Sequence, residues 1–244
     1  MLKNQKSIVL LLYLRLNKLF MQLILSNIKI QVNKNLYVKD PETSDLGKKI
    51  IKNSILLIDE IGLEHFTFKK LGEKISSNES SIYRYFDNKH KLVMYLSSWY
   101  WSWMEYKLVF ATANIANANE KLEKAITIVT EKITDDVSTE HIDEAVLNKI
   151  IISEFNKAIY TKEVDEDNKE GCFLAYKNVI NRIVAIVEEV NPDYPFAKSL
   201  VSTIVEGSLH QHFLNDHLKT ITNCNESISV TAFYLDLMNR ALKK

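Results

Sequence analysis

Glycine, proline and cysteine are all scarce in this sequence of 244 residues. Five glycines and three prolines supply too little material for the many turns of an all-β fold, so long helices are expected instead. The two cysteines, Cys172 and Cys224, form no CxxC motif and have no spacing typical of metal ligands. A disulfide framework or a zinc site is therefore not expected, and a reducing, cytoplasmic compartment fits this cysteine usage.

Sequence motifs of catalysis are also missing. The chain has no glycine-rich phosphate loop, no GxSxG elbow and no HExxH pair, so neither an enzyme nor a cofactor is expected. The apolar stretch 7–16 is too short to span a bilayer, and no small-x-small cleavage site follows it. Residues 1–20 are interpreted either as a loosely packed tail or as sequence that precedes a start at Met21.

Charge is balanced over the whole chain but divided unequally along it. Residues 1–92 hold 16 lysines and arginines against 9 acidic residues, whereas residues 93–244 hold 15 against 22. A basic front and an acidic rear indicate that the front part meets a polyanion, although charge can also drift along a chain by chance.

Apolar residues recur at helical spacing through most of the sequence. The pattern predicts an all-α protein of about nine helices, and residues 191–195, which include two prolines, form a firm break. A polar, charged stretch at 161–170 is expected to be a loop, and residues 28–32 alternate as in a short strand. The expected helices cover residues 45–62, 68–75, 79–86, 88–110, 119–134, 142–160, 170–190, 196–218 and 226–243.

Three domains follow from this reading. Residues 1–44 are expected to form a tail and an extended arm, and residues 45–92 a compact domain of three helices. Residues 93–244 are expected to form a larger helical domain. Within residues 45–92, Thr67 and Asn78 are good N-caps for two short helices joined by a tight turn, which is helix-turn-helix geometry.

The run FTFKKLGEKISSNESSIYRYFDNKHKL, residues 66–92, resembles the signature of the TetR family of bacterial transcriptional regulators. The shared features are Phe66-Thr67 at the start of the second helix, a cap at Asn78, an apolar Ile82, and a Tyr-x-Tyr-Phe ending at Phe86. The resemblance covers residues 47–92 without a gap and implies a helix-turn-helix DNA-binding domain followed by a ligand-binding and dimerisation domain.

The same resemblance implies a role for each position. Thr67 would cap its helix and contact phosphate, Asn78 would cap the recognition helix, and Lys89 would bind phosphate. The side chains expected to face DNA are Ser80, Ser81, Tyr83, Arg84 and Tyr85. Two departures from the family pattern, Ser76-Ser77 in place of Gly-Val and Glu79-Ser80 in place of Lys-Gly, mean that the operator sequence is not transferable from a relative.

The rear helices carry three features that bear on function. Tyr95, Trp99, Trp103 and Tyr106 form one aromatic stripe, which is either core or one wall of an apolar ligand pocket. His210 is assigned to the same pocket, and a metal site built from His210, His212 and His217 is disfavoured because their spacing is poor. Apolar stripes on the last two helices could form a homodimer interface or be buried within one chain.

Together these patterns predict a homodimeric, TetR-like transcriptional regulator that binds double-stranded operator DNA. It is expected to act as a repressor that an unknown small-molecule effector releases. One alternative is a regulator without such an effector, controlled by a protein or acting as an activator. The other is an all-α enzyme whose front helices only pack.

Overall fold

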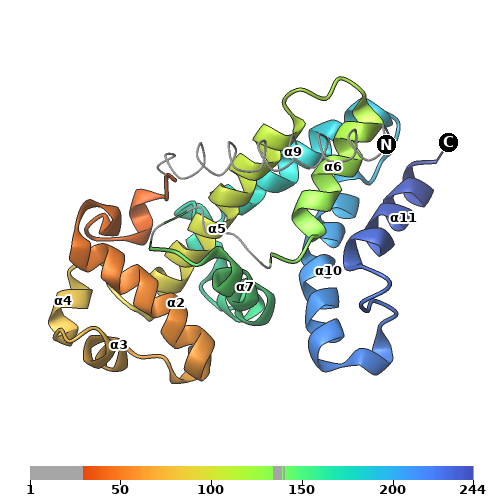
Figure 1. Ribbon diagram of the computed structural model, residues 1–244. Coiled ribbons are helices and arrows are strands. Elements are labelled where there is room, and N and C mark those ends of the chain that lie inside the picture. The colour runs from red at the N-terminus through yellow and green to blue at the C-terminus, as the bar shows by residue number, and fades with distance from the viewer. Residues whose placement is uncertain (1–29, 134–138, 140, 244) are drawn as a thin grey trace, which may run out of the picture.

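The computed structural model describes residues 30–133, 139 and 141–243, and this part of the chain is helical without a β-strand (Figure 1). The expected all-α class is confirmed. The described residues form ten α-helices and three 3-10 helices. The assignments for residues 1–29, including the tail, lie outside the described residues. No helix in the described part is long and apolar enough to cross a membrane.

The front of the molecule consists of α2 (Asp45–His65), α3 (Phe68–Lys74) and α4 (Glu79–Tyr83); we call these three helices and the turns between them the head. Helix α2 contacts α3 and also α7 and η2, and its buried isoleucines and leucines belong to the hydrophobic core. The regular helix is interrupted at Gly62, as expected, because this residue has φ of 75°, which glycine adopts without steric cost.

Helix α5 (Lys89–Thr112) runs from the head through the centre of the molecule (Figure 1). It contacts α6, α7 and α9, so nearly every side chain from Leu92 to Trp101 is buried. A helix that is apolar on all sides is stable only when neighbours surround it, and here they do.

The rear of the molecule, which we call the body, packs around α5. Residues 191–195 separate two of its long helices, as the prolines predict. The charged stretch 161–170 is not simply a loop, because it contains one short helix that ends before Gly171. The body helices are α6 (Ala118–Thr130), α7 (Glu144–Ile159), α8 (Val164–Lys169), α9 (Leu174–Val190), α10 (Ala197–His217) and α11 (Val230–Leu242).

Residues 30–44, which we call the arm, lie against both head and body. The expected strand is wrong for residues 30–32, which have no regular structure, and two 3-10 turns, η1 (Lys34–Leu36) and η2 (Pro41–Thr43), follow. Leu36 is fully buried in the core, and the rings of Tyr37 and Tyr95 meet edge to face at 6.0 Å. The arm is therefore packed structure and not a free extension.

Candidate DNA-binding head and effector groove

The turn between α3 and α4 is held by side-chain caps at the start of both helices. The Thr67 hydroxyl accepts from the Lys70 amide at 3.2 Å, and the Asn78 side chain accepts from the Ser81 amide at 2.9 Å. Both residues thus cap their helices as predicted from sequence. Within the turn Ser76 adopts φ of 55°, a left-handed conformation that a glycine would adopt more readily.

Glycine is nevertheless required one turn earlier, at Gly72 of α3. A Cβ atom there would lie 2.8 Å from the Ser77 carbonyl oxygen, which is closer than such atoms approach. The close contact lets the turn fold back over α3 and fixes the position at which α4 begins. Ile82 and Phe86 are both fully buried beneath α4, so they decide which face of this helix points outward.

The outward face of α4 presents Ser80, Tyr83 and Arg84, all of which are exposed. Tyr83 is 49% exposed, and its ring packs edge to face on Phe68 at 5.0 Å while its hydroxyl donates to Glu79 at 3.3 Å. The Tyr83 ring is thus fixed at the surface, and the Glu79 carboxylate is engaged within α4. These side chains offer hydroxyl and guanidinium donors of the kind that contact phosphates and base edges.

Ser81 and Tyr85 point inward, so the expectation that they face outward is wrong. The Ser81 hydroxyl donates to the Asn78 side chain at 2.6 Å. Tyr85 is 3% exposed, its hydroxyl hydrogen-bonds Ser44 at 2.8 Å, and Lys39 lies over its ring. Helix α4 spans only five residues, and its end brings Tyr85 under the arm instead of towards solvent.

Lys89 lies at the first position of α5, as predicted, but its ammonium is engaged. Its Nζ donates to the Leu63 carbonyl at 2.5 Å, at the end of α2. To reach a phosphate it would have to exchange this bond. The sequence reasoning did not single out Lys69 and Lys70, which α3 exposes; their position opposite the buried face of a short amphipathic helix was the available signal.

Three residues of the aromatic stripe of α5, Tyr95, Trp99 and Trp103, are core. Tyr95 is 1% exposed and packs against Phe86 at 5.4 Å. Trp99 and Trp103 are stacked on each other at 6.3 Å and are buried to the same degree. The assignment of these three residues to a ligand pocket is wrong, because α5 is surrounded and its aromatic rings fill the space between head and body.

The histidines of α10 also differ from the expectation. His210 is exposed and does not line the groove described below. His212 is buried instead and hydrogen-bonds the Thr130 carbonyl at 2.8 Å, so its Nε2 carries the proton. Burial lowers the pKa of His212 and keeps the ring neutral.

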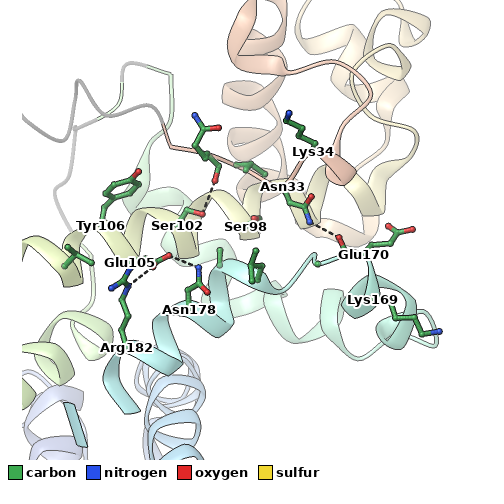
Figure 2. A pocket seen from close by; sticks show the side chains of 16 residues that line it. Asn33, Lys34, Ser98, Ser102, Glu105, Tyr106, Lys169, Glu170, Asn178 and Arg182 are labelled. Atoms are coloured by element: carbon green, nitrogen blue, oxygen red, sulfur yellow. Dashed lines mark hydrogen bonds and ion pairs between the residues drawn. The ribbon is translucent and has the colours of Figure 1, made fainter. Parts of the chain in front are cut away.

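A groove of about 740 Å³ lies between the arm, the outer face of α5 and the start of α9 (Figure 2). Of the predicted pocket residues only Tyr106 lines it. No sequence pattern predicts this site, because its walls come from segments far apart in the chain. The principal lining residues are Lys34, Ser98, Ser102, Glu105, Tyr106, Val109, Lys169, Gly171, Leu174, Ala175, Asn178 and Arg182.

Hydrogen bonds organise the groove at both ends. At one end Glu105 accepts from Arg182 Nε at 2.6 Å and from Asn178 at 3.2 Å. At the other end the Asn33 side chain donates to the Glu170 carbonyl at 2.8 Å (Figure 2). The groove thus has a rigid polar frame around its apolar centre, which is typical of small-molecule sites.

Beside the groove, one group of side chains has a composition that metal ions favour. Ligand atoms of Asp167, Glu170 and Cys172 lie within 4.8 Å of one another. Other partners already engage them: His90 Nε2 lies 2.7 Å from Asp167, and Lys91 forms an ion pair with Glu170. Burial raises the pKa of the Cys172 thiol to about 11, so it is protonated at neutral pH. We describe the group as the junction that joins α5 to α8.

No family model matches the sequence, and no curated protein matches it. Several solved structures share its fold. Superantigen PfiT is 16% identical, with a TM-score of 0.57 over 84% of this chain and 100% of that one. AibR, solved with isovaleryl coenzyme A and operator DNA, is 12% identical with a TM-score of 0.53, over 79% of this chain and 97% of that one.

The fatty acid degradation regulator FadR from Bacillus halodurans is 15% identical, with a TM-score of 0.53 over 80% of this chain and 97% of that one. At such identities the likeness establishes the fold alone. One of these proteins is a superantigen and another is a regulator of fatty acid degradation, so the shared fold does not determine the function of this chain.

Proposed function

We propose that this protein is a TetR-like transcriptional regulator that binds operator DNA through α4 as a homodimer and represses transcription until a small molecule releases it. The observation that carries the proposal is the head: two capped short helices, joined by a tight turn, hold Ser80, Tyr83 and Arg84 on one exposed face. The shared fold with AibR, whose structure contains operator DNA, supports it.

The chemistry of the head suits a polyanion. Lys69 and Lys70 are exposed on α3, next to the α4 face, and add positive charge where phosphates would lie. Such contacts release counterions from DNA, so binding should weaken steeply as salt rises. The exposed N-terminal end of a recognition helix is also the part that contacts base edges in the major groove.

We propose a dimer because the surface of one head that could contact DNA bases is small. A recognition helix this short reads few bases, and a two-fold dimer doubles the site, with half-sites about one helical turn, roughly 34–36 Å, apart. Large apolar side chains are exposed around the end of α10 and on α11, which makes this region the proposed interface. They are Leu218, Ile221, Ile228 and Phe233.

Release by a small molecule requires a site in the body, and the groove beside α5 is the proposed one. Its volume is in the range typical of ligand pockets, about 300–1,000 Å³. Helix α5 forms its floor and continues into the head. A ligand that favours one placement of α5 would shift the population of head spacings away from the one that fits DNA.

The deciding experiment is selection of bound sequences from random DNA, followed by binding measurements on the selected site. Wild-type protein should bind it in a salt-dependent manner, and Tyr83→Ala with Arg84→Ala should weaken binding at least tenfold. Lys124→Gln, which removes an exposed charge from α6, is the matched control and should bind normally. If the protein shows no salt-sensitive binding to any selected DNA or to the DNA upstream of its own gene, the regulator proposal is wrong.

The dimer has its own test. Phe233→Asp should shift the sedimentation coefficient from dimer to monomer, whereas Phe196→Asp, at an exposed phenylalanine beside the other end of α10, should leave the dimer intact. A monomeric wild-type protein at micromolar concentration would contradict this part of the proposal. The alternative regulator without a small-molecule effector predicts operator binding that no ligand of the groove changes.

A further inference from the structure

One face of α5 lines the groove with a row of polar side chains. Ser98, Ser102 and Glu105 follow one another at spacings of four and three residues, so they share this face and extend over about 10 Å of the helix axis (Figure 2). The Ser102 hydroxyl donates to the Gln31 carbonyl of the arm at 3.3 Å, and its oxygen remains able to accept. The α5 side of the groove therefore offers hydroxyl and carboxylate groups in one line.

Ser98 carries unused hydrogen-bonding capacity into this row. The residue is 5% exposed and lines the groove, and its hydroxyl has no hydrogen-bond partner among the described residues. A hydroxyl group that is removed from bulk water without a partner costs free energy. A bound molecule with a polar group above Ser98 would supply the missing bond.

At one end of the row, Glu105, Asn178 and Arg182 form what we call the polar cluster. Arg182 Nε and the Asn178 amide both donate to the Glu105 carboxylate, at 2.6 Å and 3.2 Å, so the charges of Glu105 and Arg182 compensate each other. Lys34 and Lys169 point away from this space (Figure 2). Two guanidinium nitrogens and the Asn178 carbonyl oxygen keep free donor and acceptor positions among the described residues. The cluster thus presents donors and acceptors without net charge.

Other parts of the groove wall are aliphatic. Val32 of the arm and Leu174 and Ala175 of α9 line it, and Leu174 is 57% exposed. Exposed aliphatic surface is unfavourable in water, so a ligand that covers Leu174 gains free energy from the contact.

We propose that the groove binds an uncharged, polyhydroxylated molecule with an apolar part, of which an alkyl glycoside is an example. A hydroxyl group both donates and accepts, so neighbouring hydroxyls match the carboxylate, amide and guanidinium groups of the polar cluster. A further polar group of the ligand reaches Ser98, and the apolar part lies against Leu174. A charged ligand fits less well, because a cluster without net charge does not compensate the loss of its water shell. This inference rests on the proposed effector site and names the ligand class that it takes.

The ligand class is tested by calorimetry on the full-length protein. The probe is octyl glucoside below its micelle-forming concentration, and octan-1-ol, octanoate and octylamine have the same chain length without the polyol. Octyl glucoside should bind about tenfold more tightly than each of the other three, because only it engages several groups of the row. Equal binding of octan-1-ol, octanoate or octylamine overturns the assignment.

The position of the ligand is tested with two neighbouring serines of α5. Ser97 and Ser98 are each 5% exposed, but only Ser98 lines the groove. Ser98→Ala should weaken binding of octyl glucoside by about threefold to tenfold, the effect of one hydrogen bond, whereas Ser97→Ala should leave it unchanged. The melting temperatures of both variants show that they fold. Equal effects of the two substitutions contradict the placement over Ser98.

The charge balance of the polar cluster is tested at its arginine. Arg182→Gln leaves the Glu105 carboxylate without its counterion, so octylamine should bind about threefold more tightly and octyl glucoside more weakly. Arg240→Gln is the matched control, because Arg240 is also exposed and ion-paired, with Asp236 on α11, and it should change neither affinity. An unchanged preference among the probes in Arg182→Gln means that the ligand lies elsewhere.

These measurements need no DNA, so they separate this inference from the proposed function. Binding of octyl glucoside by a protein that binds no operator contradicts only the regulator proposal. Operator binding by a protein that does not bind octyl glucoside contradicts only the ligand class inferred here.

Discussion

Side-chain caps are distributed unequally between head and body. The side chains of Ser44, Thr67 and Asn78 cap the three head helices, and Asn88 caps α5 where it leaves the head. In the body, α6 and α11 are capped in the same way, but α8, α9 and α10 start without any side-chain cap. The head therefore depends on caps at every helix, whereas the body does so only at some.

The difference has a physical reason. Helices α3 and α4 contain seven and five residues, and helices of this length are unstable alone, so each needs its cap and a buried anchor. The long body helices are ordered by burial against one another. A head specified locally keeps its own shape, which suits the proposed DNA-binding role, whereas a body held by packing has more freedom to adjust.

The largest expected effect is a loss of stability when a buried ring beneath the head is removed. Phe86 is fully buried and meets Tyr95 of α5, so Phe86→Ala should cost about 3–5 kcal/mol of unfolding free energy. Urea unfolding followed by circular dichroism measures this loss. Phe196→Ala, at an exposed ring beside the start of α10, should cost far less, and equal losses would show that the head has no anchor of its own.

A second test compares two glycines that lie under close contacts. At Gly47 of α2 a Cβ atom would lie 2.2 Å from the Pro41 carbonyl oxygen, whereas at Gly207 of α10 it would lie 2.3 Å from the Tyr234 hydroxyl. Backbone cannot move aside as a side chain can, so Gly47→Ala should cost about 1–3 kcal/mol and Gly207→Ala less. Thermal unfolding of both variants shows which substitution lowers the stability more. A larger loss for Gly207→Ala would mean that the backbone of the arm at Pro41 moves aside at little cost.

A third test removes one side-chain cap from the head and one from the body. Asn78→Ala and Asn117→Ala each remove a side-chain cap, from α4 and α6 respectively, and each should cost about 1 kcal/mol of stability. If the proposed function holds, only Asn78→Ala should also weaken operator binding, because it loosens the start of α4, the helix proposed to contact DNA. If both variants bind operator equally well, local capping has no bearing on the reading face.

The smallest expected effect is a pH dependence confined to the body. Burial lowers the pKa of His212 in the folded protein below its ordinary value of 6.5, so the unfolded chain binds a proton first as pH falls. The contribution is complete above about pH 6.5 and is lost as pH drops through the folded pKa. His212→Gln should flatten the melting temperature between pH 7.5 and 5.5; an unchanged slope would assign the effect elsewhere.

Features that depend on neighbouring residues could be predicted from the sequence, whereas features that depend on distant segments could not. The caps at Thr67 and Asn78 and the interruption at Gly62 were predicted correctly because each depends on a few neighbouring residues. The inward turn of Tyr85 was missed, since it depends on where a five-residue helix ends and on the arm above it. The sequence is compatible with the aromatic stripe being either core or the wall of a pocket. The helices that surround α5 bury Tyr95, Trp99 and Trp103 and so make them core.

By itself the sequence determined the helical class, the order of the helices and the capped turn that holds Tyr83 and Arg84 outward, since spacing and capping act over a few residues. Tertiary structure alone decided that the arm packs over Tyr85, that Trp99 is core and that a groove opens beside Tyr106. These features depend on which apolar faces pack against each other, and the segments that pack together are distant in the chain.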